Sequence, residues 1–576
     1  MILVAPSRIE EYSARGWWGE ETIGERFIRT ALAQPEAFAV ADGPHLTAIC
    51  GRPAREWNWS ELLRETGRWA AFLHAAGLRK DDIAVVQLPN CVDLHALYLA
   101  CAATGVIISP LPVQYRAHEI HHALALTGAR VAITTDQVGW HASASYWAEQ
   151  HLRTGEITQL WSLGGSPPTG ALDADRALSQ TIPWDARALR RHMADIGLTA
   201  HDVLTLCWTS GTEAAAKAVP RNHNEWLVVG TSVVESAGLQ PGAHLLIPFP
   251  FVNMAGMSTS LMAWLLAAGG LRHHHPFDLS LFIEQLRKHP ADYTVAAPAV
   301  IAMLLKDPGL LDGVDLSRLR TIGSGGAPVA EWLVDQLAER FGIELVNHFG
   351  SNEGAALAST PRDVPDRRQR ARFFPRLGVD RHIWQTPLAA RTRTRLVDLE
   401  TGNEITRAGE VGELRFQGPA IFSGYFRSPE LTRRAFDELG YYRTGDLFAI
   451  DGDQDQFYRF VGRHKDIIIR GGMNISAEEI EAMLLDHPKI REAAAIGVTD
   501  AILGERICAV VVPRAAADPP TLADLVAHLR DHHGAAAFKW PERLEMIDAL
   551  PRNPVGKILK RTLREMFCAG GPAGSG

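Results

Sequence analysis

The sequence predicts an α/β protein with a large N-terminal domain of layered α/β subdomains plus a β-rich subdomain, and a small α+β C-terminal domain. Up to Asn347, compact apolar runs alternate with segments of helical spacing, which is typical of parallel strands joined by helices. From about residue 380 to 460, short extended runs are separated by glycine turns. After Gly462 a new helix begins at the capping box Ser476-Ala477-Glu478-Glu479.

The alternating pattern occupies two stretches of the chain. In the first, strands and helices are predicted in turn at Ile83–Leu88, Val92–Ala103, Val106–Ser109, Arg116–Leu126 and Arg130–Thr134. In the second they are predicted at Val203–Cys207, Asn224–Ala237, His244–Pro248, Leu319–Ile322, Pro328–Phe341 and Glu344–Asn347. Residues 140–200 are less periodic, which predicts a loop-rich connection between the two stretches.

Composition and charge exclude several classes of protein. The 576 residues are 46% hydrophobic and 22% charged, which excludes a disordered, collagen-like or coiled-coil chain. The net charge is -8 and no long basic run occurs, so nucleic acid is not an expected partner. Polar residues and prolines interrupt the most apolar stretch, Leu94–Val113, so no membrane span is expected. Six cysteines without a CxxC pair, and the absence of a signal-peptide pattern, indicate a cytoplasmic protein.

Three consecutive histidines, His273-His274-His275, raise the question of a metal site. Adjacent side chains of an extended segment point to opposite faces, which is poor spacing for one ion. The pattern predicts a surface loop instead.

A cluster of hydroxyl residues follows the strand predicted at Val203–Cys207. Thr209-Ser210-Gly211-Thr212, with Lys217 close behind, has the hydroxyls, the glycine and the cation that a phosphate-binding loop requires. Taken alone, a cluster of this kind is more often a plain turn.

Further motifs follow in a fixed order. They are Gly325-Gly326-Ala327-Pro328, His348-Phe349-Gly350-Ser351-Asn352-Glu353-Gly354, Tyr442-Arg443-Thr444-Gly445-Asp446-Leu447, Gly462-Arg463-His464-Lys465-Asp466, Gly471-Gly472 and Pro551-Arg552-Asn553-Pro554-Val555-Gly556-Lys557. In order and spacing the chain resembles the adenylate-forming superfamily, from about residue 20 to 567. This group includes acyl-CoA synthetases, aryl-acid ligases, peptide-synthetase adenylation domains and luciferases. The stand-alone ligases for aromatic or alicyclic acids are nearest in character.

The resemblance implies a two-step reaction. A carboxylate attacks the α-phosphate of ATP to form an acyl-adenylate, and a thiol, usually that of coenzyme A, then displaces AMP. Asp446 would bind both ribose hydroxyls, Phe349 would stack on adenine, and Glu353 would hold Mg²⁺. The nucleotide-binding set so implied is Gly325, Gly326, Ala327, His348, Phe349, Gly350, Ser351, Asn352, Asp446 and Arg463.

The resemblance also implies a hinge at Lys465, between a large domain of residues 1–463 and a mobile small domain of residues 464–576. Lys557 would neutralise charge during adenylation. Rotation of the small domain would then withdraw Lys557 and bring in Gly471 and Gly472, which leave space for pantetheine. The implied catalytic residues are therefore Lys557, Glu353, Gly471 and Gly472.

The implied acyl pocket consists of Val252, Asn253, Gly256, Gly326 and Gly350. The amide of Asn253 could bind a substrate oxygen, which favours a bulky, oxygenated acid. A structural loop asparagine fits this position as well. No acidic residue for an α-amine is evident nearby, which argues against an amino acid.

The phosphate loop departs from the pattern of the superfamily. It comprises Thr209, Ser210, Gly211, Thr212, Glu213, Ala214 and Lys217, with Glu213 in place of a hydroxyl residue and Ala214 in place of glycine. A carboxylate would stand beside the β- and γ-phosphates, where two like charges about 4 Å apart cost roughly 1–4 kcal/mol. Thioester formation starts from an adenylate that lacks these phosphates. The leading interpretation is therefore an enzyme specialised for the second half-reaction.

Several alternatives stay open. A complete ATP-dependent acid–CoA ligase would explain why Lys557 and Glu353 are retained. The thiol could belong to a carrier protein instead of coenzyme A, and a non-catalytic adenylate binder is the alternative outside enzymes. Acyl-AMP, AMP and coenzyme A are expected ligands, whereas ATP and Mg²⁺ depend on the first half-reaction. A separate adenylating enzyme would be a partner if that half-reaction is lost.

Overall fold

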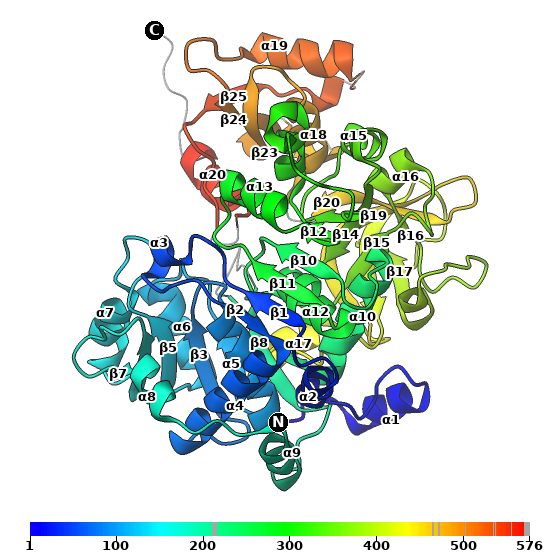
Figure 1. Cartoon of the computed structure of the whole chain (residues 1–576). Coiled ribbons are helices and arrows are strands. Elements are labelled where there is room, and N and C mark those ends of the chain that lie inside the picture. Colours follow the sequence, from blue (N-terminus) through cyan, green and yellow to red (C-terminus); the bar gives the residue numbers. More distant parts are fainter. Residues whose placement is uncertain are drawn as a thin grey trace.

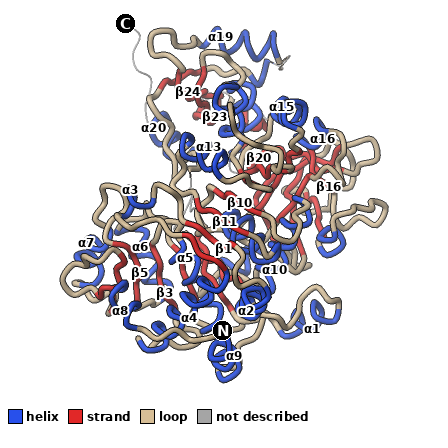
Figure 2. Tube along the Cα trace, in the orientation of Figure 1, coloured by secondary structure: helices blue, strands red, loops and turns tan. Residues whose placement is uncertain are grey.

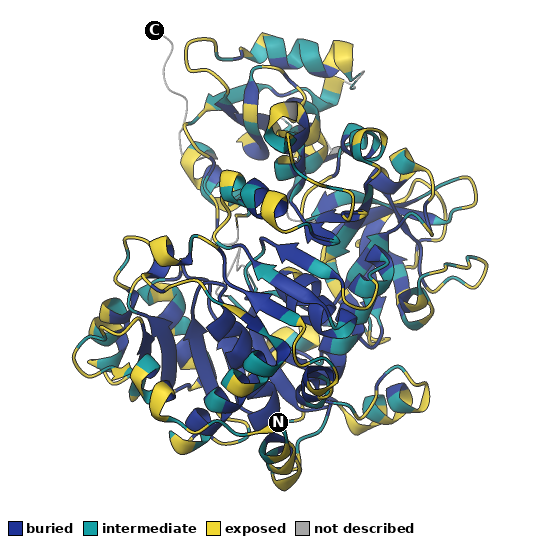
Figure 3. Ribbon diagram, in the orientation of Figure 1, coloured by how far each residue is buried: buried dark blue, intermediate teal, exposed yellow. Residues whose placement is uncertain are grey.

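The computed structural model has a large mixed α/β unit and a smaller C-terminal unit, which confirms the predicted fold class (Figure 1). It describes residues 1–209, 216–463, 466–470, 473–500, 503–533, 535, 537–553 and 556–568. Strands lie inside and most helices lie outside them (Figure 2). The strands of the large unit are accordingly the most deeply buried elements (Figure 3).

The first sheet has seven strands in the order β7-β6-β5-β3-β4-β8-β9. Its strands are β3 (Ile83–Gln87), β4 (Ile107–Pro110), β5 (Val131–Thr135), β6 (Gln159–Leu163), β7 (Leu172–Asp173), β8 (Val203–Trp208) and β9 (Ala218–Asn222). All neighbours pair in parallel except β8 and β9. The chain reverses between these two strands, and the predicted phosphate loop connects them.

The second sheet has eight strands in the order β15-β14-β13-β12-β10-β11-β1-β2. Its strands are β1 (Phe38–Ala41), β2 (Glu56–Asn58), β10 (His244–Ile247), β11 (Gly270–His273), β12 (Tyr293–Val295), β13 (Thr321–Gly325), β14 (Glu344–Gly350) and β15 (Ala356–Ser359). Only the edge strands β2 and β15 pair in antiparallel fashion. The largest apolar core contains residues of both sheets, so the two sheets form one body.

Helices cover and separate the sheets. Before residue 463 they are α1 (Pro6–Ala14), α2 (Ile23–Ala33), α3 (Leu46–Cys50), α4 (Trp59–Ala75), α5 (Val92–Thr104), α6 (Ala117–Thr127), α7 (Ser143–Trp147), α8 (Ala174–Gln180), α9 (Ala186–Asp195), α10 (His223–Ala237), α11 (Met254–Met257), α12 (Ala263–Ala267), α13 (Leu279–Lys288), α14 (Pro298–Lys306), α15 (Glu331–Phe341), α16 (Arg367–Arg372) and α17 (Pro429–Ala435). Every residue of α5 is buried, because this helix is apolar on all sides. Among the described residues, no helix is long and apolar enough to cross a membrane.

The predicted β-rich subdomain is a five-stranded antiparallel sheet in the order β16-β20-β19-β18-β17. Its strands are β16 (Phe373–Pro375), β17 (Arg393–Val397), β18 (Val411–Gln417), β19 (Tyr442–Asp451) and β20 (Phe457–Arg463). Phe349 at the end of β14 packs against the core of this sheet. The β-rich subdomain is thereby attached to the carboxyl end of the second sheet.

The C-terminal unit has its own sheet and its own apolar core. It consists of β21 (Ile467–Arg470), β22 (Met473–Ser476), α18 (Ala477–Leu485), β23 (Ile490–Asp500), β24 (Gly504–Pro513), α19 (Leu522–Ala527), β25 (Arg543–Met546) and α20 (Lys560–Cys568). Ser476 caps α18, because its Oγ accepts a hydrogen bond from the Glu479 amide at 3.1 Å. The predicted hinge residue Lys465 lies outside the described residues.

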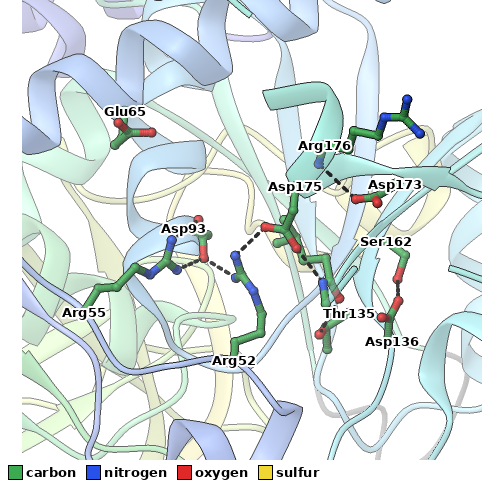
Figure 4. Close-up of polar contacts among 12 residues, drawn as sticks. Arg52, Arg55, Glu65, Asp93, Thr135, Asp136, Ser162, Asp173, Asp175 and Arg176 are labelled. Carbon is green, nitrogen blue, oxygen red and sulfur yellow. Dashed lines mark hydrogen bonds and ion pairs between the residues drawn. The ribbon is translucent and has the colours of Figure 1, made fainter. Parts of the chain in front are cut away.

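The prediction of a loop-rich connection over residues 140–200 is wrong. The segment contains α7, α8, α9 and the strand β6, which pairs with β5. Arg52 and Arg55 both pair with Asp93 of α5, and Arg52 Nη2 also lies 2.7 Å from Asp175 Oδ1 at the start of α8 (Figure 4). Burial raises the pKa of Asp93, but the two guanidinium groups outweigh burial and lower it to about 2. The start of α8 is therefore fixed by a long-range ion pair and β6 by pairing with β5, and periodicity reveals neither contact.

The prediction that His273, His274 and His275 form a surface loop is also wrong. His273 ends the central strand β11, and both His273 and His274 are fully buried. Desolvation lowers the pKa of His273 to about 3 and that of His275 to about 4. Within the described residues, no group of three metal-binding side chains is arranged to hold an ion. The expectation that they bind no metal stays a prediction.

Buried neutral histidines are expected to make the fold sensitive to acid. Burial lowers the pKa of His223 to about 4, and its Nδ1 accepts a hydrogen bond from the Ile23 amide at 3.2 Å. The unfolded chain takes up the proton near pH 6.5, so folding loses about 1.4 kcal/mol per pH unit for each such histidine between about pH 6.5 and 4. Thermal unfolding should therefore shift to lower temperature in this window. A His223→Gln variant should show a smaller decrease in unfolding temperature over this pH range, whereas a His118→Gln variant, changed at an exposed site, should behave like the unmodified protein. Equal decreases in all three proteins would show that His223 does not cause the acid sensitivity.

Candidate active site

Asp446 lies at the centre of a buried polar cluster between β19 and β20. It is directly opposite Arg463 in the ladder, and Arg463 Nε lies 3.1 Å from Asp446 Oδ1. Its own amide donates to Thr444 Oγ1 at 3.0 Å, which fixes the turn. Only 3% of Asp446 is exposed. Burial raises the pKa of this carboxyl, while the charges of Arg463 and Lys557 act in the opposite direction.

Lys557 lies near this carboxylate although it belongs to the C-terminal unit. The Lys557 amide donates to Asn553 Oδ1 at 2.8 Å, and its carbonyl accepts from the Asn553 amide at 2.8 Å. The charge of Lys557 lowers the pKa of Asp446, which opposes the effect of burial. The structure therefore brings together two of the predicted residues that are 111 positions apart in the sequence.

The ends of β13 and β14 form the predicted adenine side of the site. Gly325 is paired with His348, and a Cβ at Gly325 would lie 2.3 Å from the His348 carbonyl oxygen. Gly326 has φ +79°, a conformation that favours glycine. Phe349 packs edge-to-face against Phe448 with ring centroids 5.1 Å apart. These glycines leave space beside the strand ends, and stacking of adenine on Phe349 stays a prediction.

Tyr425 connects two predicted residues that the sequence separates. Its hydroxyl donates to Glu353 Oε1 at 2.8 Å and accepts from Lys217 Nζ at 3.2 Å. The Lys217 ammonium also lies 4.5 Å from the centre of the Tyr425 ring. Burial and the Glu353 charge both raise the pKa of Tyr425, so its hydroxyl stays protonated and donates. Periodicity gives no signal for this contact, and Tyr425 is not among the predicted site residues.

Glu353 meets the requirements of a magnesium ligand shared with phosphates. Its side chain is largely buried, and one carboxylate oxygen is held by Tyr425. Mg²⁺ is commonly bound by one or two carboxylates together with substrate phosphates, so a single protein carboxylate suffices here. When bound, the ion would neutralise charge on the phosphates.

Asn352 joins the predicted phosphate side to the predicted acyl side. Its Nδ2 donates to the carbonyl of Trp208, the residue before Thr209, at 2.9 Å. Its Oδ1 accepts from the Met254 amide at the start of α11 at 2.8 Å. One side chain thus fixes the end of β8 relative to α11.

Three of the predicted acyl-pocket residues lie in or directly before α11, whereas Gly350 ends β14 and Gly326 follows β13. Val252 is buried, and the Asn253 carboxamide oxygen accepts from the Gly256 amide at 3.0 Å as the N-cap of α11. A Cβ at Gly256 would lie 1.9 Å from the Pro250 carbonyl oxygen, so no larger residue fits. This cap supports the structural interpretation of Asn253, whereas binding of a substrate oxygen by its amide stays a prediction.

Part of the predicted site lies outside the described residues. This part comprises Ser210, Gly211, Thr212, Glu213 and Ala214 of the phosphate loop, the hinge residue Lys465, and Gly471 and Gly472. Both ends of the loop are described: the Lys217 amide donates to Thr209 Oγ1 at 3.0 Å. Ser351 belongs to the same turn as Glu353, and its amide donates to the Ala355 carbonyl at 2.9 Å.

Comparisons with known proteins cover both units. Residues 29–426 match the family model of the AMP-binding enzymes, and residues 479–557 match that of the AMP-binding enzyme C-terminal domain. The chain is 30% identical to pyochelin synthase PchD of Pseudomonas aeruginosa over 97% of this chain and 94% of that protein. It is 29% identical to the 2-hydroxy-7-methoxy-5-methyl-1-naphthoate–CoA ligase of Streptomyces carzinostaticus over 96% and 94% of the two chains.

Solved structures share the fold. ATP-bound MatB from Rhodopseudomonas palustris superposes with a TM-score of 0.76 at 24% identity, covering 95% of this chain and 99% of that one. With both family models matched in order, the chain belongs to the AMP-binding, adenylate-forming enzymes and is an acid ligase that works through an acyl-adenylate.

Proposed function

We propose that this enzyme forms the coenzyme A thioester of a bulky, oxygenated aromatic or alicyclic acid, and that it is specialised for the second half-reaction. One observation carries the proposal. Asp446, expected to hold the ribose of AMP, is buried and paired with Arg463, whereas the loop expected to hold the β- and γ-phosphates carries Glu213 and Ala214. These two substitutions are therefore expected to impair adenylation, the half-reaction that needs those phosphates.

In the proposed step, the sulfur of coenzyme A attacks the carbonyl carbon of the acyl-adenylate. A C–S bond forms, the C–O bond to the phosphate of AMP breaks, and the thiol proton is lost to solvent. Asp446 would hold the ribose of the adenylate, and Arg463 would hold Asp446 in place and contact the ribose or phosphate. These contacts are expected to persist until AMP leaves.

The loop sequence supports selective loss of adenylation. Each pair of like charges about 4 Å apart costs roughly 1 kcal/mol in water and about 4 kcal/mol near a protein surface. If the position of Ala214 requires a left-handed backbone, alanine adds about 1–2 kcal/mol. Since about 1.4 kcal/mol is a factor of ten in rate, these costs together amount to several orders of magnitude.

The substrate class rests on the acyl pocket and on one relative. The predicted pocket has no evident acid for an α-amine, and Asn253 keeps an amide group that could bind oxygen. A relative of 29% identity over nearly the whole chain is a ligase for a methoxylated naphthoate. Both features favour an oxygenated ring system as the acyl group.

A complete ATP-dependent ligase is the second candidate, and one contact favours it. Lys217 and Glu353, on the phosphate side of the site, are connected through Tyr425 and so remain organised. Transfer to the thiol of a carrier protein involves the same chemistry as transfer to coenzyme A. The assay below also covers a protein that binds the adenylate without turning it over.

The decisive experiment compares two arms over a panel of aromatic, alicyclic and fatty acids. One arm contains free acid, ATP, Mg²⁺ and coenzyme A, and the other contains synthetic acyl-adenylate and coenzyme A. We expect thioester to form much faster in the second arm. Equal rates in both arms would exclude specialisation for the second half-reaction. Absence of thioester in both arms would favour a non-catalytic protein that only binds adenylates.

We further propose that residues 1–463 and 464–576 rotate about Lys465 between half-reactions. A Lys557→Ala variant should then hardly affect thioester formation from acyl-adenylate, because Lys557 serves the adenylation arrangement. Leucine at Gly471 should abolish this transfer by filling the pantetheine route. The two variants are compared on synthetic adenylate; a larger loss for Lys557→Ala would mean that the enzyme relies on the adenylation arrangement.

Tyr425→Phe provides a test that is specific for the phosphate side. Removing the hydroxyl breaks the hydrogen bonds to Glu353 and Lys217, each to a charged group and worth about 1.5–3 kcal/mol. Residual ATP-dependent turnover should fall at least tenfold and need more Mg²⁺, while transfer from adenylate stays nearly unchanged. Tyr441→Phe is the matched control. Equal losses in both reactions would show that Tyr425 only supports packing.

A further inference from the structure

A cavity of about 240 Å³ lies between the N-terminal helix and the β-rich subdomain. α1 contributes Arg8 and Tyr12, and Trp17 follows this helix. None of the described residues that line the cavity belongs to the predicted nucleotide, metal or acyl sets. In Figure 1, α1 lies at the lower edge of the molecule, whereas α18 to α20 lie at the upper end. The cavity therefore lies outside the set of residues predicted for the active site.

The cavity carries excess positive charge. Arg393 begins β17, Arg391 ends the 3-10 turn just before it, and both line the cavity together with Arg8. Among the described residues, none forms an ion pair with any of these three arginines. Arg8 Nη2 donates to the Ile421 carbonyl at 2.9 Å, and the Arg8 guanidinium lies 5.5 Å from the centre of the Tyr12 ring. The one acidic residue of the lining, Glu11, is paired with Arg15 at 3.1 Å. A concave surface lined by cations attracts an anion.

Aromatic rings form the remainder of the wall. Tyr12 and Trp17 contact each other with ring centroids 5.5 Å apart. Phe436 lines the opposite side and is stacked on Phe422 at 5.5 Å. These rings are held in place by their neighbours, so they present preformed apolar surface beside the arginines.

We infer that this cavity binds a small planar anion, a single aromatic ring that carries a carboxylate. The fork of a guanidinium group matches a carboxylate in a bidentate arrangement, which assigns the carboxylate to Arg391 and Arg393. The ring then packs against Trp17 and Phe436. The volume of about 240 Å³ is below the roughly 300–1,000 Å³ of pockets for drug-sized ligands, which favours a one-ring acid over a nucleotide. This inference does not depend on the proposed half-reaction.

The test is equilibrium dialysis of radiolabelled benzoate against the full-length protein, with the active site saturated by a non-hydrolysable acyl-adenylate analogue. Benzoate should bind with one equivalent, and less tightly as salt is raised. Arg391→Gln and Arg393→Gln should each lower the affinity at least tenfold, since each removes a charge-assisted contact. Trp17→Leu should lower it about fivefold, since an aromatic contact is worth about 0.5–1.5 kcal/mol.

Arg433→Gln is the matched control, because Arg433 is an exposed arginine of α17 that pairs with Glu430 outside the cavity. It should bind benzoate like the unmodified protein. Thermal unfolding should be unchanged for the Arg391 and Arg393 variants, since neither residue has an ion pair among the described residues. Unchanged benzoate binding in Arg391→Gln would overturn the inference. Tighter binding of AMP or inorganic phosphate than of benzoate would also overturn it. Since no turnover is measured, failure of the proposed activity leaves this result unaffected.

Discussion

Replacing Asp446 by alanine is expected to lower the affinity for acyl-adenylate and for AMP at least tenfold. Only 3% of Asp446 is exposed and Arg463 aligns its side chain, so the carboxylate is preorganised to accept hydrogen bonds. A hydrogen bond to a charged acceptor contributes about 1.5–3 kcal/mol, and two ribose hydroxyls are available. Thioester formation from adenylate should fall in proportion, because the ribose is held in both half-reactions. Calorimetric titration with AMP and the adenylate arm of the assay measure the two effects.

The matched control is Asp451→Ala on the same pair of strands. Asp451 Oδ2 pairs with Arg459 Nε at 2.9 Å, as Asp446 pairs with Arg463, but Asp451 is the last residue of β19 and is more exposed. This variant should bind AMP normally. Unchanged AMP affinity in Asp446→Ala would mean that Asp446 only fixes the turn after Thr444.

Restoring the usual residues of the phosphate loop is expected to accelerate ATP-dependent turnover. A Glu213→Thr, Ala214→Gly double variant would, under the proposal, remove a carboxylate from the side of the β- and γ-phosphates and supply a glycine. Relief of even one like-charge pair of about 1–4 kcal/mol corresponds to a rate increase of roughly five- to a thousandfold. The rate from synthetic adenylate should not change, since that substrate lacks both phosphates. The ratio of the two rates is the measured quantity.

Glu149→Thr removes the same charge from an exposed position and should leave both rates unchanged. If the double variant is no faster with ATP, and the unmodified enzyme already uses ATP as well as adenylate, then Glu213 does not impede adenylation. The complete ligase would then be the better assignment.

Much of the fold follows from local patterns in the sequence. Apolar runs such as 83–88 and 203–207 become central parallel strands, because a strand buried on both faces is apolar throughout. The sequence did not predict β6, which lies in a segment of weak periodicity and is fixed by pairing with β5. It also misassigned His273, whose polar ring is buried among aromatic side chains at the end of β11. Burial of a polar residue depends on distant neighbours.

The residues of the candidate site that belong to sequence motifs can be predicted from the sequence. Asp446 and Arg463 were both predicted, and the ladder places them opposite each other. Their direct pairing was not predictable, since strand register is a property of the assembled sheet. Tyr425 was missed for the same reason: its partners Glu353 and Lys217 come from segments far apart in the sequence.

The double contact of Asn352 has a consequence for redesign of substrate preference. Because one carboxamide connects the backbone before the phosphate loop with the first turn of α11, a shift of α11 to admit a larger acid would also displace Trp208. Enlarging the pocket from this side should therefore reduce catalytic turnover together with selectivity. Gly256, wedged against Pro250, restricts the same helix. Libraries for new substrates are better directed at walls that share no backbone contact with Asn352.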